Sequence, residues 1–114
     1  MTYTDRGGCD FFGFNHHGAH VAIEAKQCGV ERKSLPLWKA DEGFGVKVHQ
    51  MQHLREVANA GGFGLIVWKR GENVVILDTL PLDMECTSFK ATDTERWHPI
   101  GQLGDRLEEV LSAS

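Results

Sequence analysis

Two acidic residues and a lysine in the first quarter of the chain have the types and spacing of a divalent-metal site. Glu24 and Lys26 lie in the otherwise apolar segment 21–26, and Asp10 lies further toward the N-terminus. In a β-strand, successive side chains point to opposite faces of the sheet. Glu24 and Lys26 should therefore share one face with Ala22. The other face would be directed toward a core and would carry Val21, Ile23 and Ala25.

Such a set of residues supports hydrolysis assisted by a metal ion. If residues 16–19 form the turn of a hairpin, Asp10 lies at the outer end of the neighbouring strand, about level with Lys26 or one pair beyond it. Carboxylate oxygens bind Mg²⁺ or Mn²⁺, and a bound metal ion lowers the pKa of a water molecule. A nearby lysine can orient that water or offset charge on a phosphate. The alternative is a surface ion pair between Glu24 and Lys26 without a catalytic role.

The framework that positions these residues can be predicted from hydrophobic periodicity. Short apolar or aromatic runs predict strands over residues 9–15, 20–26, 64–69 and 73–79. Apolar side chains that recur every three or four positions predict helices over residues 46–60 and 102–111. The order β-β-α-β-β-α indicates one α/β domain over residues 1–114, with a central mixed β-sheet flanked by helices.

The segments between these elements have no clear period. Residues 27–45 contain several glycines and a proline, and we interpret them as a long functional loop. Residues 82–100 are poorly patterned. Gly61 and Gly62 are expected to end the first helix.

Length, hydropathy and cysteine content favour a cytoplasmic protein without a membrane partner. The 114 residues suffice for one core. No apolar run approaches the roughly 18 residues of a membrane span, and the first residues do not resemble a signal peptide. Three widely spaced cysteines favour reduced thiols over a disulfide framework.

The net charge of −4 is unusual for a protein that contacts phosphates, but the charges are unevenly distributed. Residues 26–55 are rich in basic side chains, whereas residues 103–114 are mainly acidic. One face of the domain is therefore expected to be basic and the other acidic.

Five short motifs, in order along residues 9–68, resemble the RecU family of Holliday junction resolvases in the PD-(D/E)xK nuclease superfamily. They are Cys9-Asp10-Phe11-Phe12-Gly13-Phe14, Ile23-Glu24-Ala25-Lys26, Ser34-Leu35-Pro36-Leu37, His49-Gln50, and Gly61-Gly62 before an apolar strand. The resemblance implies a restriction-endonuclease-like fold and a Mg²⁺- or Mn²⁺-dependent endonuclease that hydrolyses DNA phosphodiester bonds. It also implies branched DNA, such as a four-way junction, as substrate, in bacterial or phage-encoded recombination or repair.

The resemblance implies a role for each matching residue. Asp10 and Glu24 would hold the metal ion, together with the backbone carbonyl of Ala25. Lys26 would be the catalytic lysine, and Gln50 would support the active site at the start of its helix.

The chain departs from the family pattern at three points. Cys9 stands where the superfamily motif has proline, and no stalk-like insertion for entering a junction is present. Few residues precede Asp10, so the helix that often supplies a further acidic residue is not expected; Glu31, Asp41 or Glu42, or a partner chain, could replace that residue. The departures leave open a nicking or restriction-type nuclease, or a catalytically silent nuclease-fold module that binds DNA or protein.

Candidate DNA-contacting residues lie in the long loop and at the start of the first helix: Lys33, Ser34, Trp38, Lys39, His49 and His53. Trp38 is equally consistent with stacking on a base and with packing. Zinc is an alternative metal, with candidate ligands Cys9, His16, His17, His20 and Cys28, but their spacing matches no familiar zinc motif.

A homodimer is expected because two symmetric cuts in a junction require two sites and this domain has room for one. One candidate interface is the aromatic strand with Phe11, Phe12 and Phe14. The other is the apolar side of the last helix, with Leu103, Leu107 and Leu111.

Overall fold

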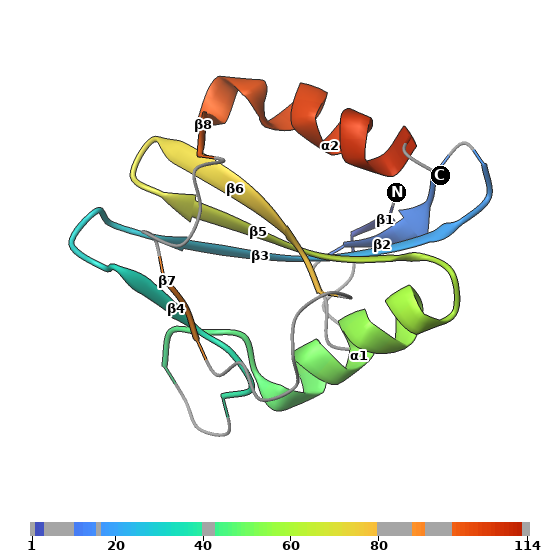
Figure 1. Cartoon of the computed structure of the whole chain (residues 1–114), viewed down its shortest axis with the longest axis horizontal. Helices are drawn as coiled ribbons and strands as arrows, with labels where there is room; N and C mark the ends of the chain where they lie inside the picture. The colour runs from blue at the N-terminus through green and yellow to red at the C-terminus, as the bar shows by residue number, and fades with distance from the viewer. Residues whose placement is uncertain are drawn as a thin grey trace.

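A mixed β-sheet forms the centre of the molecule in the computed structural model (Figure 1). The structure describes residues 2–3, 11–15, 17–39, 43–79, 88–90 and 97–112. Within these residues the sheet has six strands in the order β1-β2-β3-β5-β6-β8. They are β1 (Thr2–Tyr3), β2 (Phe11–Phe14), β3 (His20–Cys28), β5 (Phe63–Arg70), β6 (Asn73–Asp78) and β8 (His98–Pro99). Two further strands, β4 (Ser34–Pro36) and β7 (Ser88–Lys90), pair with each other.

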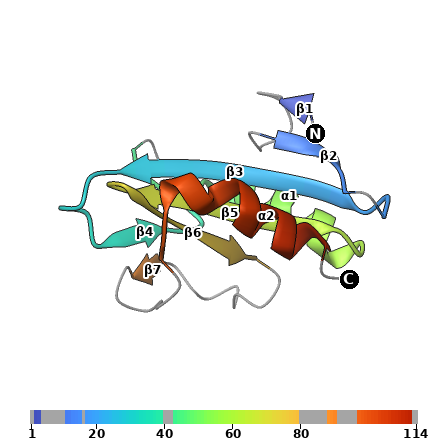
Figure 2. The ribbon, with the colours of Figure 1, turned by 90° about the horizontal axis from the view of Figure 1, so that it is seen from above.

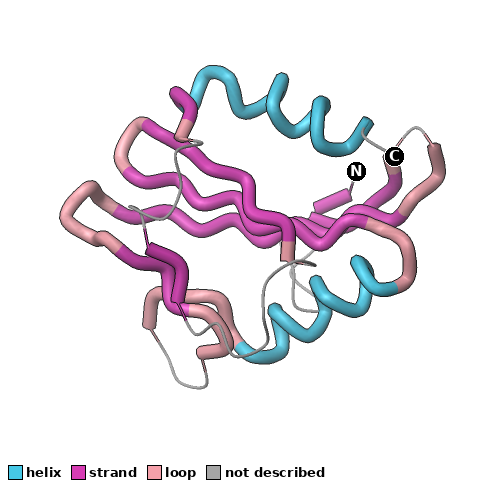
Figure 3. The backbone as a smooth tube through the Cα atoms, in the orientation of Figure 1, coloured by secondary structure: helices cyan, strands magenta, loops and turns pink. Residues whose placement is uncertain are grey.

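Two helices cover opposite faces of this sheet (Figure 3). Helix α1 (Val48–Asn59) packs on one face, and α2 (Leu103–Ser112) packs on the other after the short 3₁₀ turn η2 (Ile100–Gln102). Seen from above, β1 and β2 lie at one edge of the sheet (Figure 2). The chain is therefore a single α/β domain with three layers.

The strands β3 and β5 run parallel, whereas the other described pairs in the sheet are antiparallel. The parallel pair follows from the connection, because the chain crosses back through α1 between these strands. Strands β5 and β6 are joined by a tight turn in which Gly71 has φ 63°, a conformation that glycine adopts without steric cost.

Both faces of the sheet are buried, one under each helix. The α1 face contains Ala22, Ile66, Trp68, Val75 and Leu77, which pack with Met51, Leu54 and Val57 of the helix. The α2 face contains Val21, Ile23, Leu65, Val67 and Val74, which pack with Leu103, Leu107, Val110 and Leu111. The alternation expected for β3 is therefore observed. Ala25 is a correction, because it was expected to face a core and is exposed, whereas Ala22 on the other face is buried.

The predicted order β-β-α-β-β-α captures the longer elements and misses the short strands β1, β4, β7 and β8. Strand β4 lies within residues 27–45, which were interpreted as a loop, and β7 and β8 lie within the poorly patterned residues 82–100. Strands of two or three residues have no readable period. They form through partners distant in the sequence, as where Leu35 lies opposite Phe89. Strand β3 also continues past Lys26 to Cys28, because β5 pairs with it to its end.

Asn15 fastens the β2–β3 turn to the end of α2. Its Nδ2 donates a hydrogen bond to the carbonyl of Leu111 (2.8 Å), while its Oδ1 accepts from the backbone N–H of Ala19 (2.9 Å). These hydrogen bonds hold the β2–β3 turn against the C-terminal end of α2. None of the described helices is both long and apolar enough to cross a membrane.

Candidate functional site

Glu24 places a carboxylate inside the layer between the sheet and α1. It lies in the middle of β3, opposite Ile66 of the parallel strand β5, and only 2% of it is exposed. Burying an ionised group is costly unless nearby groups replace its hydration. Lys26 supplies one such group, because its Nζ lies 3.1 Å from Oε1 of Glu24. The side chain of Lys26 is 18% exposed, so the lysine is the member of the pair that reaches solvent.

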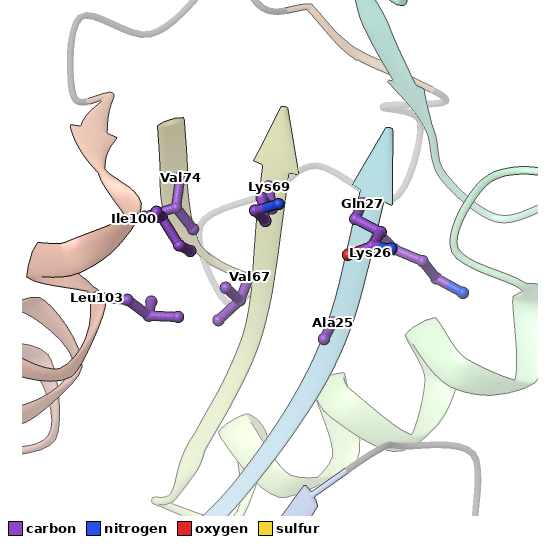
Figure 4. Close-up of a pocket in the computed structure, with 8 residues that line it drawn as sticks. All are labelled: Ala25, Lys26, Gln27, Val67, Lys69, Val74, Ile100 and Leu103. Carbon is purple, nitrogen blue, oxygen red and sulfur yellow. The ribbon is translucent and has the colours of Figure 1, made fainter. Parts of the chain in front are cut away.

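Glu24 and Lys26 share the α1 face of β3, as the sequence predicted. The neighbouring residue on that face, Ala22, belongs to the core under α1. Figure 4 shows the side chain of Lys26 leaving the strand on the side away from Val67 and Leu103. A salt bridge is therefore present, but one of its members is buried rather than on the surface.

Asp10, the proposed second metal ligand, lies outside the described residues, as do the alternative acids Asp41 and Glu42 and also Cys9. The described part of β2 begins at Phe11, directly after Asp10, and Phe11 pairs with Ile23. The remaining alternative acid, Glu31, is exposed in the turn after β3.

Gln50 has a clear structural role at the start of α1. The backbone N–H of Lys47, the residue before the helix, donates to Oε1 of Gln50 (2.8 Å). This is the reciprocal half of a capping box, which satisfies a donor that the helix start leaves without a partner. The resemblance assigned Gln50 to active-site support, and the structure shows how its side chain holds the first turn of α1.

Aromatic and histidine side chains gather where β2, β3 and α1 meet. The ring of Phe12 lies 5.6 Å from that of His20 and 5.9 Å from that of His53. Phe14 contacts His20 edge-to-face at 4.7 Å. The sequence analysis did not predict this cluster, although strand alternation in the paired strands β2 and β3 places Phe12, Phe14 and His20 on one face. His53 could not be paired with them before the position of α1 was known.

The loop that leads into α1 is held in an unusual conformation at Trp38. This residue has φ 58°, which is strained for a bulky side chain. Its ring packs against the core under α1, and Nε1 is buried with no hydrogen-bond acceptor among the described residues. The backbone of Lys39 then forms an isolated β-bridge with the backbone of Lys47. This pairing joins the two ends of the loop directly before α1. Packing is the role of Trp38 that the structure describes; stacking on a base stays a prediction.

The other candidate DNA-contacting residues lie between the end of β3 and the first two turns of α1. Lys33 is exposed before β4, and Ser34, half-buried, pairs with Lys90 in the small two-stranded sheet. His49 is exposed on the first turn of α1, one turn before His53.

Charged side chains lie on both sides of the sheet, and Lys69 of β5, which alternates with Val67, belongs to the α2 side. Lys26 and Lys47 lie on the α1 side, at the strand and at the helix start. On the opposite side α2 exposes Asp105, Glu108 and Glu109. The expected division into a basic and an acidic face stays a prediction.

Three of the zinc candidates, His17, His20 and Cys28, lie in the described residues. The described residues contain no group of three or more histidine, cysteine or acidic side chains that could hold a metal ion. His20 and Cys28 stand at opposite ends of β3, and Sγ of Cys28 accepts a hydrogen bond from Nε1 of Trp68 (3.3 Å). These two residues therefore cannot share a site. Cys9 and His16 lie outside the described residues.

Comparisons with protein-family models and with curated proteins found no match to this chain.

Proposed function

We propose that this protein is a metal-dependent endodeoxyribonuclease of the PD-(D/E)xK type, with a restriction-endonuclease-like fold. The observation that carries the proposal is the buried carboxylate of Glu24 on a central strand, with Nζ of Lys26 at 3.1 Å. A buried ion pair is a weak source of stability, since apolar residues of similar volume often serve as well. Buried charges of this kind concentrate at functional sites. The α/β sheet with a helix on each face agrees with the fold that the resemblance implies.

Asp10 is the proposed second carboxylate. Phe11 pairs with Ile23, so the same register continued by one residue would bring Asp10 opposite Glu24. Directly opposite residues of an antiparallel pair have side chains on the same face. Asp10, Glu24 and the carbonyl of Ala25 would then offer oxygen atoms, which Mg²⁺ and Mn²⁺ prefer.

The residues would divide the work as follows. A divalent cation, when bound, would lower the pKa of a water molecule and stabilise charge on the phosphate. Glu24 would hold its carboxylate in one orientation, because its burial leaves few alternative rotamers. Lys26, which reaches solvent, would orient the attacking water or offset negative charge on the phosphate. Gln50 would act as a positioning residue through the first turn of α1.

We propose the α1 side of the molecule as the DNA-binding surface. It carries Lys26 and Lys47, while the acidic side chains of α2 lie on the opposite side. Lys33, Ser34, Trp38, Lys39, His49 and His53 are the proposed contacts. Branched DNA, in particular a four-way junction, is the proposed substrate on the strength of the sequence motifs, which implies a role in recombination or repair.

The proposal is tested by cleavage of labelled four-way junctions and linear duplexes in Mg²⁺ or Mn²⁺. The substitution Glu24→Gln preserves the shape of the side chain and removes the negative charge that a cation needs. It should lower the cleavage rate by roughly 100-fold or more and weaken Mn²⁺ binding in calorimetry. Glu56→Gln, which changes an exposed acid on α1, is the matched control and should leave both unchanged.

Other outcomes would select the alternatives. Equal Mn²⁺ binding and equal cleavage by the protein and by Glu24→Gln would refute the assigned site. Cleavage of linear duplex in preference to junctions would indicate a nicking or restriction-type nuclease. Junction binding without cleavage in either metal would indicate a catalytically silent module.

A further inference from the structure

A cavity of about 300 Å³ lies on the face of β3 opposite to Glu24 and Lys26, at the end of the sheet where α2 begins. Its lining is drawn in Figure 4: Ala25, Lys26, Gln27, Val67, Lys69, Val74, Ile100 and Leu103. This volume is at the lower end of the range for small-molecule sites. Ala25 and Lys26 also belong to the proposed nuclease site, but the side chain of Lys26 leaves β3 on the side away from this cavity (Figure 4).

The walls of the cavity are mainly aliphatic. Val67 and Val74 come from β5 and β6, and Ile100 and Leu103 come from η2 and the start of α2. Figure 4 shows these four side chains gathered around a common space. Ile100 is 37% exposed, although large aliphatic side chains gain free energy when they are removed from water. An occupant with an apolar body would cover this surface.

Two polar side chains mark one end of the cavity. Gln27 and Lys69 are cross-strand neighbours near the ends of the parallel strands β3 and β5. Lys69 alternates with Leu65 and Val67, so its side chain belongs to the α2 face. None of the lining residues is acidic. Because the Lys26 side chain points away from the cavity (Figure 4), the site combines the positive charge of Lys69 and the amide of Gln27 with an aliphatic wall, which is complementary to an anion that has an alkyl chain.

We propose that this cavity binds a small amphipathic carboxylate of the medium-chain fatty acid type. Its alkyl chain would lie against Val67, Val74, Ile100 and Leu103, and its carboxylate would accept hydrogen bonds from Lys69 and Gln27. A phosphate dianion would need more donors than this pair offers. A nucleobase would need a stacking partner, and no lining residue is aromatic.

Titration with octanoate, octanol and octylammonium, followed by NMR of backbone amides and methyl groups, tests the proposal. Octanoate should bind with a Kd on the order of 1 mM, as expected for a ligand of this size. The saturable shifts should be confined to the lining residues. Octylammonium should bind at least about fivefold more weakly, because it places a positive charge beside Lys69.

Variants separate the two halves of the site. Lys69→Gln should weaken octanoate at least about fivefold and leave octanol unchanged, while Lys33→Gln, at an exposed lysine before β4, should change neither. Ile100→Trp should fill the cavity and abolish binding of both ligands; Leu103→Phe serves if that variant does not fold.

The proposal would be overturned by equal affinity for octanoate and octylammonium, by an unchanged octanoate affinity in Lys69→Gln, or by shifts along α2 that do not saturate. Because the readout is binding, the result is independent of the cleavage assay.

Discussion

Nζ of Lys26 lies 3.1 Å from Oε1 of Glu24, although the two side chains leave β3 two residues apart. Strand alternation directs both to the α1 face, and the flexible lysine folds back over the carboxylate. The exposed fractions, 18% for Lys26 and 2% for Glu24, place the lysine between the carboxylate and solvent. Removing Lys26 should therefore affect the protein differently from removing Glu24.

Lys26→Met removes the ammonium and leaves the Glu24 charge buried. We expect the free energy of unfolding to fall by roughly 2–3 kcal/mol, somewhat below the cost for a fully buried pair because Lys26 is partly exposed. Urea unfolding at neutral pH measures this. The double variant Glu24→Gln with Lys26→Met should regain most of the stability while remaining inactive. If Lys26→Met is as stable as the parent protein, the ion pair does little to stabilise the buried charge of Glu24.

Gln50→Leu should remove the hydrogen bond from the N–H of Lys47 and destabilise the protein by about 1 kcal/mol. Cleavage should fall as well, because the first turn of α1 loses its anchor. Gln50→Glu keeps an acceptor oxygen and should restore both stability and cleavage. If Gln50→Glu is stable but inactive, the amide nitrogen of Gln50 has a direct role in the reaction. Chemical unfolding and junction cleavage are measured on the same preparations.

Gly64→Ala tests the close approach of α1 to β5. A Cβ at this position would lie 2.0 Å from the carbonyl oxygen of Leu54 and 2.9 Å from Oγ1 of Thr79. Because backbone must move, we expect a loss of about 2 kcal/mol or more in thermal or urea unfolding. Gly104→Ala is the control: it lies in α2 with no atom within 4 Å of the added Cβ, and should stabilise by up to about 1 kcal/mol. Equal stability of the two variants would contradict the described packing.

The homodimer stays a prediction, and its two candidate surfaces differ in how far they are exposed. On the apolar side of α2, Leu103 and Leu107 pack against the core and remain half-buried. Phe14 is 59% exposed beside His20 and is the better anchor. Sedimentation equilibrium at micromolar concentration should show twice the 12.7 kDa chain mass, and Phe14→Ser should return the protein to a monomer. Val30→Ser, at another exposed apolar residue, is the control. A 12.7 kDa species that still cuts both strands of a junction in concert would exclude the dimer.

The sequence by itself determined the local features of this protein. Alternation along residues 20–26 placed Glu24 and Lys26 on one face of a strand, because that period is a property of extended backbone. The three-and-four spacing of Met51, Leu54 and Ala58 predicted α1 and its buried side. The short gap between the strands predicted over residues 64–69 and 73–79 marked the turn between β5 and β6. These features depend on residues close together in the chain.

Tertiary structure alone decided the environment of those residues. Glu24 is buried because β5 lies beside it and α1 covers its face, and neither contact can be read from residues 20–28. The pairing of β4 with β7, the contact of Phe12 with His53, and the cavity beside Lys69 each join segments distant in the sequence. Their formation depends on how the helices pack across a twisted sheet, so periodicity in one segment cannot specify them. The sequence pattern thus identified the candidate residues, and tertiary packing determined which of them are buried and which contact one another.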